Sequence, residues 1–263
     1  WSQNPNGQSD QNSLNDTITR PLAAALCGQY TIGGASPSFS NFTQAAFALN
    51  NAGVACPVVF KVRNGTYNEQ IKIYDIPGAS AINQVTFESE NGDSSLVSLH
   101  YQVSNPTNDF TLSLLGTPYV SFKKMTVLRT NGGVSVSIQN RAHNILFENC
   151  RLGNFFTPNA GVDSVLTLRR NNLQGYYIDL RHTLGNTTSK VVVENNLLDN
   201  LYADYCQNIS ITGNRNTIDP NSFLNQILIY RSKNLSIQGN RFIRLYCETD
   251  TIVDIRNNVG GPG

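Results

Sequence analysis

The stretch Asn208–Ile218 reads NISITGNRNTI, and Asn234–Ile243 reads NLSIQGNRFI, so the second nearly repeats the first after 26 residues. Each copy holds two apolar residues separated by one small polar residue, followed by a glycine, an asparagine and an arginine. The apolar–polar alternation has the period of a β-strand that buries one face. A strand repeated at a short interval is typical of proteins built by stacking, so we expect further copies along the chain.

The pattern recurs over most of the sequence. Further copies are VTFES from Val85, VSFKKMTV from Val120, ILFENCRL from Ile145, LTLRRNNL from Leu166, VVVENNLL from Val191 and VDIRNNV from Val253. The second apolar residue of each copy, its anchor, is Phe87, Phe122, Phe147, Leu168, Val193, Ile211, Ile237 or Ile255, at intervals of 18 to 35 residues. A propeller blade needs about 40 residues or more, and a leucine-rich repeat keeps a steadier period. The irregular period instead favours the coils of a parallel β-helix.

Asparagine follows most anchors by three residues. The position is occupied by Asn171, Asn196, Asn214, Asn240 and Asn258 in five copies, and by Met125 and Cys150 in two others. We expect these asparagines to take the left-handed bend at one corner of successive coils and to bond one another as an amide ladder. The alternative is a set of hairpin turns in a sandwich, although hairpins favour Asn-Gly pairs, which are rare after these strands.

The segment SPSFSNFTQAAFALNNAG is the best helix candidate. Its apolar residues fall on one face, namely Phe42, Ala45, Ala46 and Leu49. Asn41 with Gln44 forms a candidate capping box, and Gly53 follows the end. We expect a helix at about residues 40–52 that covers the N-terminal end of the solenoid, where sheet edges would otherwise be exposed. The predicted class is therefore all-β, a parallel β-helix (solenoid) with an N-terminal capping α-helix.

Composition limits the partners. The 263 residues include 19 basic and 18 acidic side chains, a net charge of +1, so no electrostatic footprint for nucleic acid is present. No apolar run approaches the roughly 20 residues that span a bilayer, so membrane insertion is not expected. Residues 1–27, which are polar, are predicted to be a linker or N-terminal extension within a longer protein. Residues 28–258 form one predicted domain and 259–263 a tail, so neighbouring domains are expected partners.

The five cysteines have no zinc-binding spacing. Cys27 and Cys56 flank the predicted helix and can form a disulfide if the protein is exported. The other three, Cys150, Cys206 and Cys247, lie in apolar stretches and are expected to be free buried thiols.

A known family shares the entry to this pattern. The run SFSNFTQAAFALNNAGVACPVVFKVRNGTYNEQIKI, with Gly65, Tyr67 and Glu69 in a Gly-x-Tyr-x-Glu turn, resembles the start of pectin-lyase-like right-handed parallel β-helix proteins, including pectin methylesterases. The run from Tyr30 to Asp93 resembles modules of very large secreted surface proteins of Bacteroidota. The resemblance is close over residues 28–95. It implies a right-handed β-helix, export and a place on the cell surface, and it transfers no catalytic activity.

Catalytic motifs are not recognisable. The two aspartates, arginine and glutamines of the pectin methylesterase motifs are not found. The nearest approach is YYIDLRH, with Asp179, Arg181 and His182, but alternation places His182 on the opposite face from the other two. His100 and His143 have no partners that the sequence identifies, and no Gly-x-Ser-x-Gly, HExxH or P-loop occurs. We therefore predict no catalytic residues and no enzyme. The alternative is a polysaccharide-active enzyme, a lyase or a carbohydrate esterase.

A second strand family lies between the anchors. Its members are VSVSI from Val134, YYIDL from Tyr176, LYADY from Leu201, ILIY from Ile227 and LYCE from Leu245. The next anchor strand starts six residues after Ala203, Ile229 and Cys247, whereas the loop RHTLGNTTSK breaks this spacing after Ile178. If these four residues point inward, their neighbours form two outward columns: Tyr177, Tyr202, Leu228 and Tyr246, and beside them Asp179, Asp204, Tyr230 and Glu248.

These columns are the predicted ligand-binding site. Sugar rings stack on aromatic faces, and carboxylates accept bonds from sugar hydroxyls, so the predicted partner is a polysaccharide or another surface glycan. No cofactor is expected, unless the acidic column holds a calcium ion. Alternatively, the tyrosines only stack on one another and stabilise the sheet. The sequence thus predicts a non-catalytic β-helix module of a secreted cell-surface protein, which serves as a stalk or spacer or as an adhesin domain.

Overall fold

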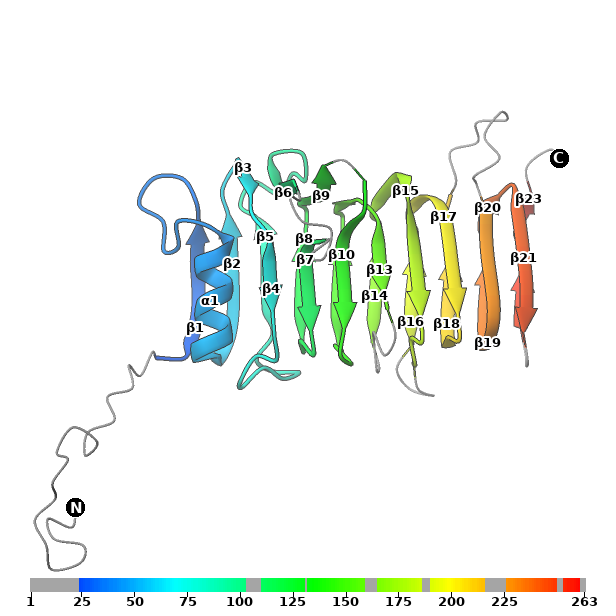
Figure 1. Cartoon of the computed structure of the whole chain (residues 1–263), viewed down its shortest axis with the longest axis horizontal. Helices are drawn as coiled ribbons and strands as arrows, with labels where there is room; N and C mark the ends of the chain where they lie inside the picture. Colours follow the sequence, from blue (N-terminus) through cyan, green and yellow to red (C-terminus); the bar gives the residue numbers. More distant parts are fainter. Residues whose placement is uncertain are drawn as a thin grey trace, which may run out of the picture.

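The computed structural model describes residues 24–102, 110–130, 132–158, 165–185, 190–215, 226–249 and 253–260. They form a parallel β-helix, in which successive coils stack along one axis from β1 to β23 (Figure 1). Of the predicted linker, residues 1–23 lie outside the described part of the chain, and β1 begins at Leu26. In that part, no helix is long and apolar enough to cross a bilayer.

Three stacks of parallel strands line the coils. The first stack contains β1 (Leu26–Ile32), β2 (Val54–Val62), β5 (Val85–Ser89), β8 (Val120–Lys123), β11 (Ile145–Glu148), β14 (Leu166–Arg169), β16 (Val191–Glu194), β18 (Gln207–Thr212), the second half of β19 (Gln226–Gln238) and β22 (Val253–Arg256). The second stack contains β4 (Ile71–Ile73), β7 (Phe110–Leu115), β10 (Val134–Gln139), β13 (Phe155–Thr157), most of β15 (Asn172–Arg181) and β17 (Leu197–Asp204), the first half of β19, and β21 (Arg244–Thr249).

Shorter strands form the third stack. They are β3 (Gly65–Asn68), β6 (Val97–Gln102), β9 (Thr126–Thr130), β12 (Arg151–Leu152), the first residues of β15 and β17, and, near the far end, β20 (Arg241–Phe242) with β23 (Val259–Gly260). The anchors predicted from the repeat pair with one another in a single column of the first stack, so the predicted coil-on-coil register is confirmed.

The anchor column begins as a stack of phenylalanine rings. Phe60, Phe87, Phe122 and Phe147 are buried, and the centroids of consecutive rings lie 4.6, 5.1 and 5.0 Å apart. Offset ring pairs add about 0.5–1.5 kcal/mol each beyond the burial of their area. From Leu168 onward the residues of this column are aliphatic. The buried column is therefore continuous, and its side chains change from aromatic to aliphatic along the axis.

Outward side chains beside the anchors alternate in charge. Lys61, Glu88, Lys123, Glu148, Arg169 and Glu194 occupy one column of the first stack. The Lys61 ammonium lies 2.6 Å from Glu88, and the Arg169 guanidinium lies 2.9 and 3.7 Å from Glu148 and Glu194. Individual exposed pairs of this kind contribute at most about 1 kcal/mol, but opposite charges in adjacent coils favour the observed register over a slipped one.

The predicted asparagine ladder is present. Asn196 donates its side-chain amide to Oδ1 of Asn214 at 3.0 Å, Asn214 to Asn240 at 3.0 Å and Asn240 to Asn258 at 3.1 Å. Each amide also donates to a carbonyl of the preceding coil, as Asn214 does to Val193 at 2.8 Å. The amides are therefore satisfied inside the solenoid, where an unpaired polar group would be costly.

The predicted backbone conformation of the ladder asparagines is wrong. The left-handed residue is the one before each of them, with φ between 54° and 64° at Arg170, Asn195, Gly213, Gly239 and Asn257. The same holds before Met125 and Cys150, where Lys124 and Asn149 have φ of 53° and 54°. That residue makes the corner, and the corner turns the next side chain inward. Only from this inward position can an amide reach the coils on both sides.

The capping helix is α1 (Phe42–Ala52), whose buried residues are the four predicted from its apolar face. Asn41 Oδ1 accepts from the backbone of Gln44, while the Gln44 side chain accepts from Ser40. The carboxylate of Glu69 accepts from the amides of Phe42 and Thr43 at 3.1 and 2.8 Å, a favourable place for a negative charge.

Tyr67 completes the docking of the helix. Its ring packs edge-on against Phe42, and its hydroxyl lies 2.8 Å from the carbonyl oxygen of Arg63. The Gly-x-Tyr-x-Glu turn that carries the family resemblance therefore holds the cap on the first coil. The resemblance in this turn is therefore accounted for by the packing of the helix, and it requires no catalytic role for Gly65, Tyr67 or Glu69.

A disulfide joins Cys27 to Cys56, as the sequence allowed. The cross-link spans 29 residues and, by loop-closure entropy, stabilises the N-terminal end by roughly 3–4 kcal/mol. Cys150 and Cys206 are buried free thiols, as predicted, whereas Cys247 is only partly buried. Burial raises the pKa of the Cys150 thiol to about 12 and that of Cys206 to about 11.

Replacement of Asn214 by alanine should lower the free energy of unfolding by about 2–4 kcal/mol, because it leaves the buried Asn196 amide and Val193 carbonyl without partners. Urea denaturation measures the change. The matched control is Asn172→Ala, an exposed asparagine with a local bond to Gln174, which should cost less than about 1 kcal/mol. Equal costs for the two variants would show that the ladder contributes little.

The raised thiol pKa values predict slow alkylation of the native protein. At about pH 8 almost no thiolate forms at Cys150 or Cys206, so iodoacetamide should label neither, and labelling should appear only as pH approaches the raised values or the chain unfolds. Peptide mapping by mass spectrometry, with and without concentrated guanidinium chloride, measures the labelling. Complete labelling in the native state would contradict the burial of these thiols.

Candidate functional site

The outward face of the second strand stack carries the predicted site, but one coil is shifted. In the structure Leu180, and not Ile178, lies opposite Ala203, so Asp179 lies opposite Tyr202 and Tyr177 opposite Asn200. The cause is an irregularity in β15, where the three residues between Leu173 and Tyr177 face the single residue between Leu198 and Asn200 in β17. The predicted membership of Tyr177 in the tyrosine column is therefore wrong.

The correct columns bring acids, bases and aromatics together. One column contains Phe156, Asp179, Tyr202, Leu228 and Tyr246. The neighbouring column contains Arg181, Asp204, Tyr230 and Glu248. All predicted site residues thus lie on adjacent coils of one face, but two are in other columns than predicted: Asp179 belongs to the column of Tyr202 and not to that of Asp204, and Tyr177 lies one column further over, opposite Asn200. The shift also adds Arg181 to the column of Asp204.

Three tyrosines form a continuous aromatic surface, called here the tyrosine row. The rings of Tyr202 and Tyr230 lie 5.5 Å apart and those of Tyr230 and Tyr246 5.3 Å apart, both tilted. The Tyr246 hydroxyl donates to Glu248 at 3.2 Å. Tyr202 and Tyr230 are half-buried and Tyr246 is 40% exposed, so the row is open to a ligand at its far end.

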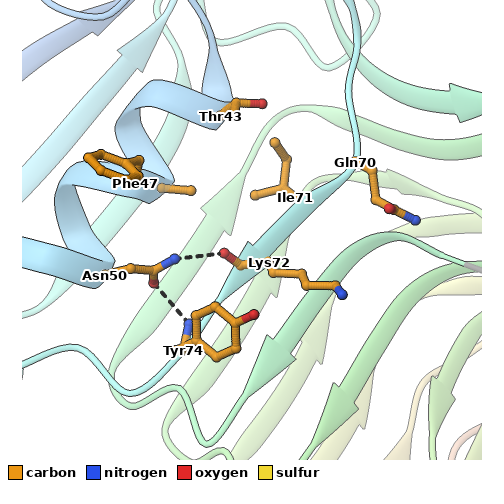
Figure 2. Close-up of a pocket in the computed structure, with 8 residues that line it drawn as sticks. Thr43, Phe47, Asn50, Gln70, Ile71, Lys72 and Tyr74 are labelled. Carbon is orange, nitrogen blue, oxygen red and sulfur yellow. Dashed lines mark hydrogen bonds between the residues drawn. The ribbon is translucent and has the colours of Figure 1, made fainter. Parts of the chain in front are cut away.

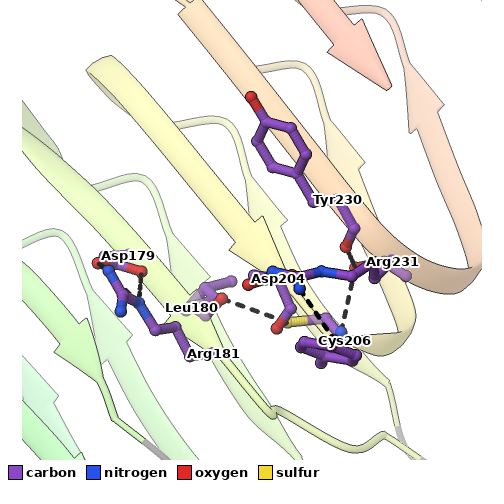
Figure 3. Close-up of polar contacts among 9 residues, drawn as sticks. Asp179, Leu180, Arg181, Asp204, Cys206, Tyr230 and Arg231 are labelled. Atoms are coloured by element: carbon purple, nitrogen blue, oxygen red, sulfur yellow. Dashed lines mark hydrogen bonds and ion pairs between the residues drawn. The ribbon is translucent and has the colours of Figure 1, made fainter. Parts of the chain in front are cut away.

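Asp179 is held by the arginine two residues later. Arg181 Nε donates to Oδ1 at 2.9 Å and Nη2 to Oδ2 at 2.8 Å, a bidentate pair (Figure 3). The guanidinium carbon lies 5.4 Å from the centre of the Phe156 ring and 5.6 Å from that of Tyr202. Rings on the two adjoining coils therefore hold the arginine, and the arginine holds the carboxylate.

Asp204 is held by an arginine from the next coil. Arg231 Nε donates to Oδ1 at 2.9 Å, and Nη2 donates to Oδ2 (Figure 3). The same guanidinium lies 4.1 Å from the centre of the Tyr205 ring, which stacks on His182 at 5.0 Å. The residues His182, Tyr205 and Arg231 have φ of 47°, 52° and 42°, so they form a second left-handed corner.

This arrangement defines the charge states of the site. The hydrogen bonds that Arg181 donates to Asp179 raise the pKa of its guanidinium, and those that Arg231 donates to Asp204 raise the pKa of the Arg231 guanidinium. Burial, and then the charge of Asp204, raises the pKa of the Tyr202 hydroxyl, which is therefore a proton donor at neutral pH. One coil and two residues separate the aspartates, which puts their α-carbons about 8 Å apart. Two oriented carboxylates can thus face one substrate.

Sequence reasoning missed Arg231, Tyr205 and Phe156. Arg231 follows the strand ILIY at a corner, and no local pattern links it to an aspartate 27 residues earlier. Among the described residues, no three His, Cys, Asp or Glu side chains are grouped to hold a metal ion, and calcium binding stays a prediction.

Solved structures with this fold are known. The chain is similar to the pectin methylesterase of Aspergillus niger in its deglycosylated form (TM-score 0.55) and in its penultimately deglycosylated form (0.54). In both comparisons 14% of residues are identical, and the similarity covers 90% of this chain and 87% of the other. No family model and no curated protein matches the chain. The class defined by the fold is the pectin-lyase-like parallel β-helix.

These neighbours contradict the prediction that the chain is not an enzyme, because both are pectin methylesterases, which are enzymes. The prediction rested on the absence of local motifs. On this fold, however, a site is assembled from single residues on successive coils, and at 14% identity motifs need not persist. The absence of a motif was therefore no argument against catalysis.

Replacement of Arg231 by methionine should lower the free energy of unfolding by about 1–3 kcal/mol, because the nearly buried Asp204 carboxylate loses two charge-assisted hydrogen bonds. Urea denaturation measures it. Arg256→Met is the control, since Arg256 also pairs with an aspartate but in an exposed position, where a loss below about 1 kcal/mol is expected. A smaller loss at Arg231 than at Arg256 would contradict the importance of the buried pair.

Proposed function

We propose that this protein is a polysaccharide-active enzyme that hydrolyses esters on a carbohydrate polymer. The observation that carries the proposal is the pair of nearly buried aspartates on adjacent coils, each oriented by an arginine, beside the tyrosine row. One nearly buried Asp–Arg pair would be enough to stabilise this face, whereas two such pairs stand side by side on it. The fold shared with pectin methylesterases supports the ester chemistry.

The roles follow from the charges. Asp204, oriented by Arg231, acts as the general base that takes a proton from water while the water oxygen attacks the ester carbonyl. Arg181, whose side chain is 46% exposed, and the protonated Tyr202 hydroxyl face the developing oxyanion. The alcohol leaves with a proton, and a carboxylic acid remains. Asp179 holds Arg181 in place.

The charge of the face supports an esterified substrate. Asp179 and Asp204 are paired with arginines, the tyrosine rings are uncharged, and Glu248 accepts from the Tyr246 hydroxyl, so the face carries one more carboxylate than it has arginines. An esterified uronic acid unit is neutral and can stack on a ring, whereas the free acid would add a second negative charge beside Glu248. We therefore propose that the substrate is an esterified uronate polymer such as methyl-esterified pectin, with the tyrosine row as its sugar contact.

The proposed place of action is outside the cell. The disulfide is compatible with secretion, and the resemblance of residues 28–95 to modules of large secreted surface proteins of Bacteroidota supports a cell-surface protein. Neighbouring domains of such a protein would present the site to the polymer.

The purified chain should release methanol from methyl-esterified pectin, and Asp204→Asn should lower kcat by at least about 100-fold, because it removes the base. Tyr246→Ala should mainly raise KM. Methanol release is measured beside acetate release from an acetylated polymer. Asp254→Asn is the control, a carboxylate paired with Arg256 on the first strand stack, and should keep full activity. Absence of ester cleavage on both polymers would overturn the proposal.

A further inference from the structure

A hollow of about 210 Å³ lies between the capping helix and the first coil, far from the aspartate pair. Thr43, Ala46, Phe47 and Asn50 line it from α1, and Gln70, Ile71, Lys72 and Tyr74 line it from β4 and the residues around it (Figure 2). Most of its lining is apolar. It is therefore a place where an apolar ring face can be received.

Two aromatic side chains of the hollow are open to solvent. Phe47 is 69% exposed and Tyr74 is 49% exposed, although both belong to segments that otherwise bury their apolar residues. A single exposed aromatic side chain is ordinary. Two aromatic side chains at the border of one hollow, in contrast, provide surfaces for stacking a flat ligand such as a sugar ring.

The hollow is held rigid by one asparagine. Asn50 donates its side-chain amide to the carbonyl oxygen of Lys72 at 3.0 Å and accepts from the amide of Tyr74 at 3.0 Å (Figure 2). These two bonds join the helix to the strand on either side of the hollow. The two backbone segments that carry the aromatic side chains are thus fixed relative to each other before any ligand arrives, which lowers the ordering cost of binding.

Lys72 gives the hollow a positive charge. Its ammonium lies 5.3 Å from the centre of the Phe110 ring and forms no ion pair within the part of the chain that the structure describes. An ammonium held beside stacking surfaces fits a sugar that carries a carboxylate. This differs from the aspartate pair, where both carboxylates and both arginines neutralise each other.

The hollow and the aspartate pair share one column. Lys72 pairs with Ser113, then the column continues through Ser137 and Phe156 to Asp179. Four coil spacings of ~4.8 Å place Lys72 about 19 Å from Asp179 on the same face. Ser113 and Ser137 between them are buried, so an extended polymer that reaches both places runs over the side chains that cover these serines, while a short fragment reaches one place alone.

We propose that the hollow formed by Phe47, Lys72 and Tyr74 is a second binding site, which holds an acidic, already de-esterified segment of the polymer whose esterified segment lies at the tyrosine row. The identity of the polymer rests on the proposed function. Phe47 and Tyr74 stack on the sugar, and Lys72 pairs with its carboxylate. The site therefore retains the product segment while hydrolysis continues further along the chain.

The test is affinity electrophoresis of the whole chain in gels that contain polygalacturonate, methyl-esterified pectin or dextran, so that no turnover is needed. Wild type should be retarded most by polygalacturonate. The double variant Phe47→Ala with Tyr74→Ala should weaken this binding by roughly fivefold, which corresponds to about 0.5 kcal/mol for each of the two ring contacts. Lys72→Gln should weaken it about threefold and abolish the preference for polygalacturonate over the esterified polymer.

Matched controls separate this site from general surface effects and from catalysis. Ile82→Ala removes another exposed apolar side chain, and Lys190→Gln removes another exposed lysine, so neither should change retardation. Asp204→Asn should lose ester hydrolysis and keep retardation by polygalacturonate. Absence of retardation in the wild type, equal weakening by the controls, or loss of retardation in Asp204→Asn would overturn the second site. Failure of the proposed hydrolysis alone would leave the retardation unchanged.

Discussion

The parallel hydrogen-bond register between coils is the constraint on which the rest of this structure depends. Because each residue lies above its counterpart at the spacing of one strand, any residue type that recurs in the sequence becomes a column in space. The phenylalanine stack, the alternating charges and the asparagine ladder are three such columns, and they all occupy one side of the coil or its corner. A shift of register in one coil of the first stack would break the columns that pass through that coil.

The register also explains how a site is assembled from separate parts of the sequence. Asp204 and Arg231 are 27 residues apart but belong to adjoining coils, where a corner turns the guanidinium onto the carboxylate. Arg181 is similarly placed between Phe156 and Tyr202 by the coils before and after its own. Such pairs keep charged groups oriented in a nearly buried position.

Much of the fold was predictable because its causes are local. The anchors alternate within each strand, the capping residues of α1 lie within a few positions of one another, and Cys27 and Cys56 flank that helix. The site was predicted only in part. Tyr202, Tyr230 and Tyr246 lie in a row as expected, whereas Tyr177 was assigned to it wrongly, because the broken spacing after this strand does not tell how many extra residues β15 contains.

By itself the sequence determined the class of fold. The alternation of apolar and polar residues in each strand, the asparagine that follows most strands and the capped helix are short-range patterns, and together they fit stacked parallel coils. Only the tertiary structure decided which acids meet which bases. Arg231 and Asp204 meet through coil stacking and a left-handed corner, and Lys72 shares a face with Asp179 through four successive pairings. Which residues meet depends on the length of every intervening loop and on the irregularity in β15. Local residue propensities do not determine the combined effect of these lengths.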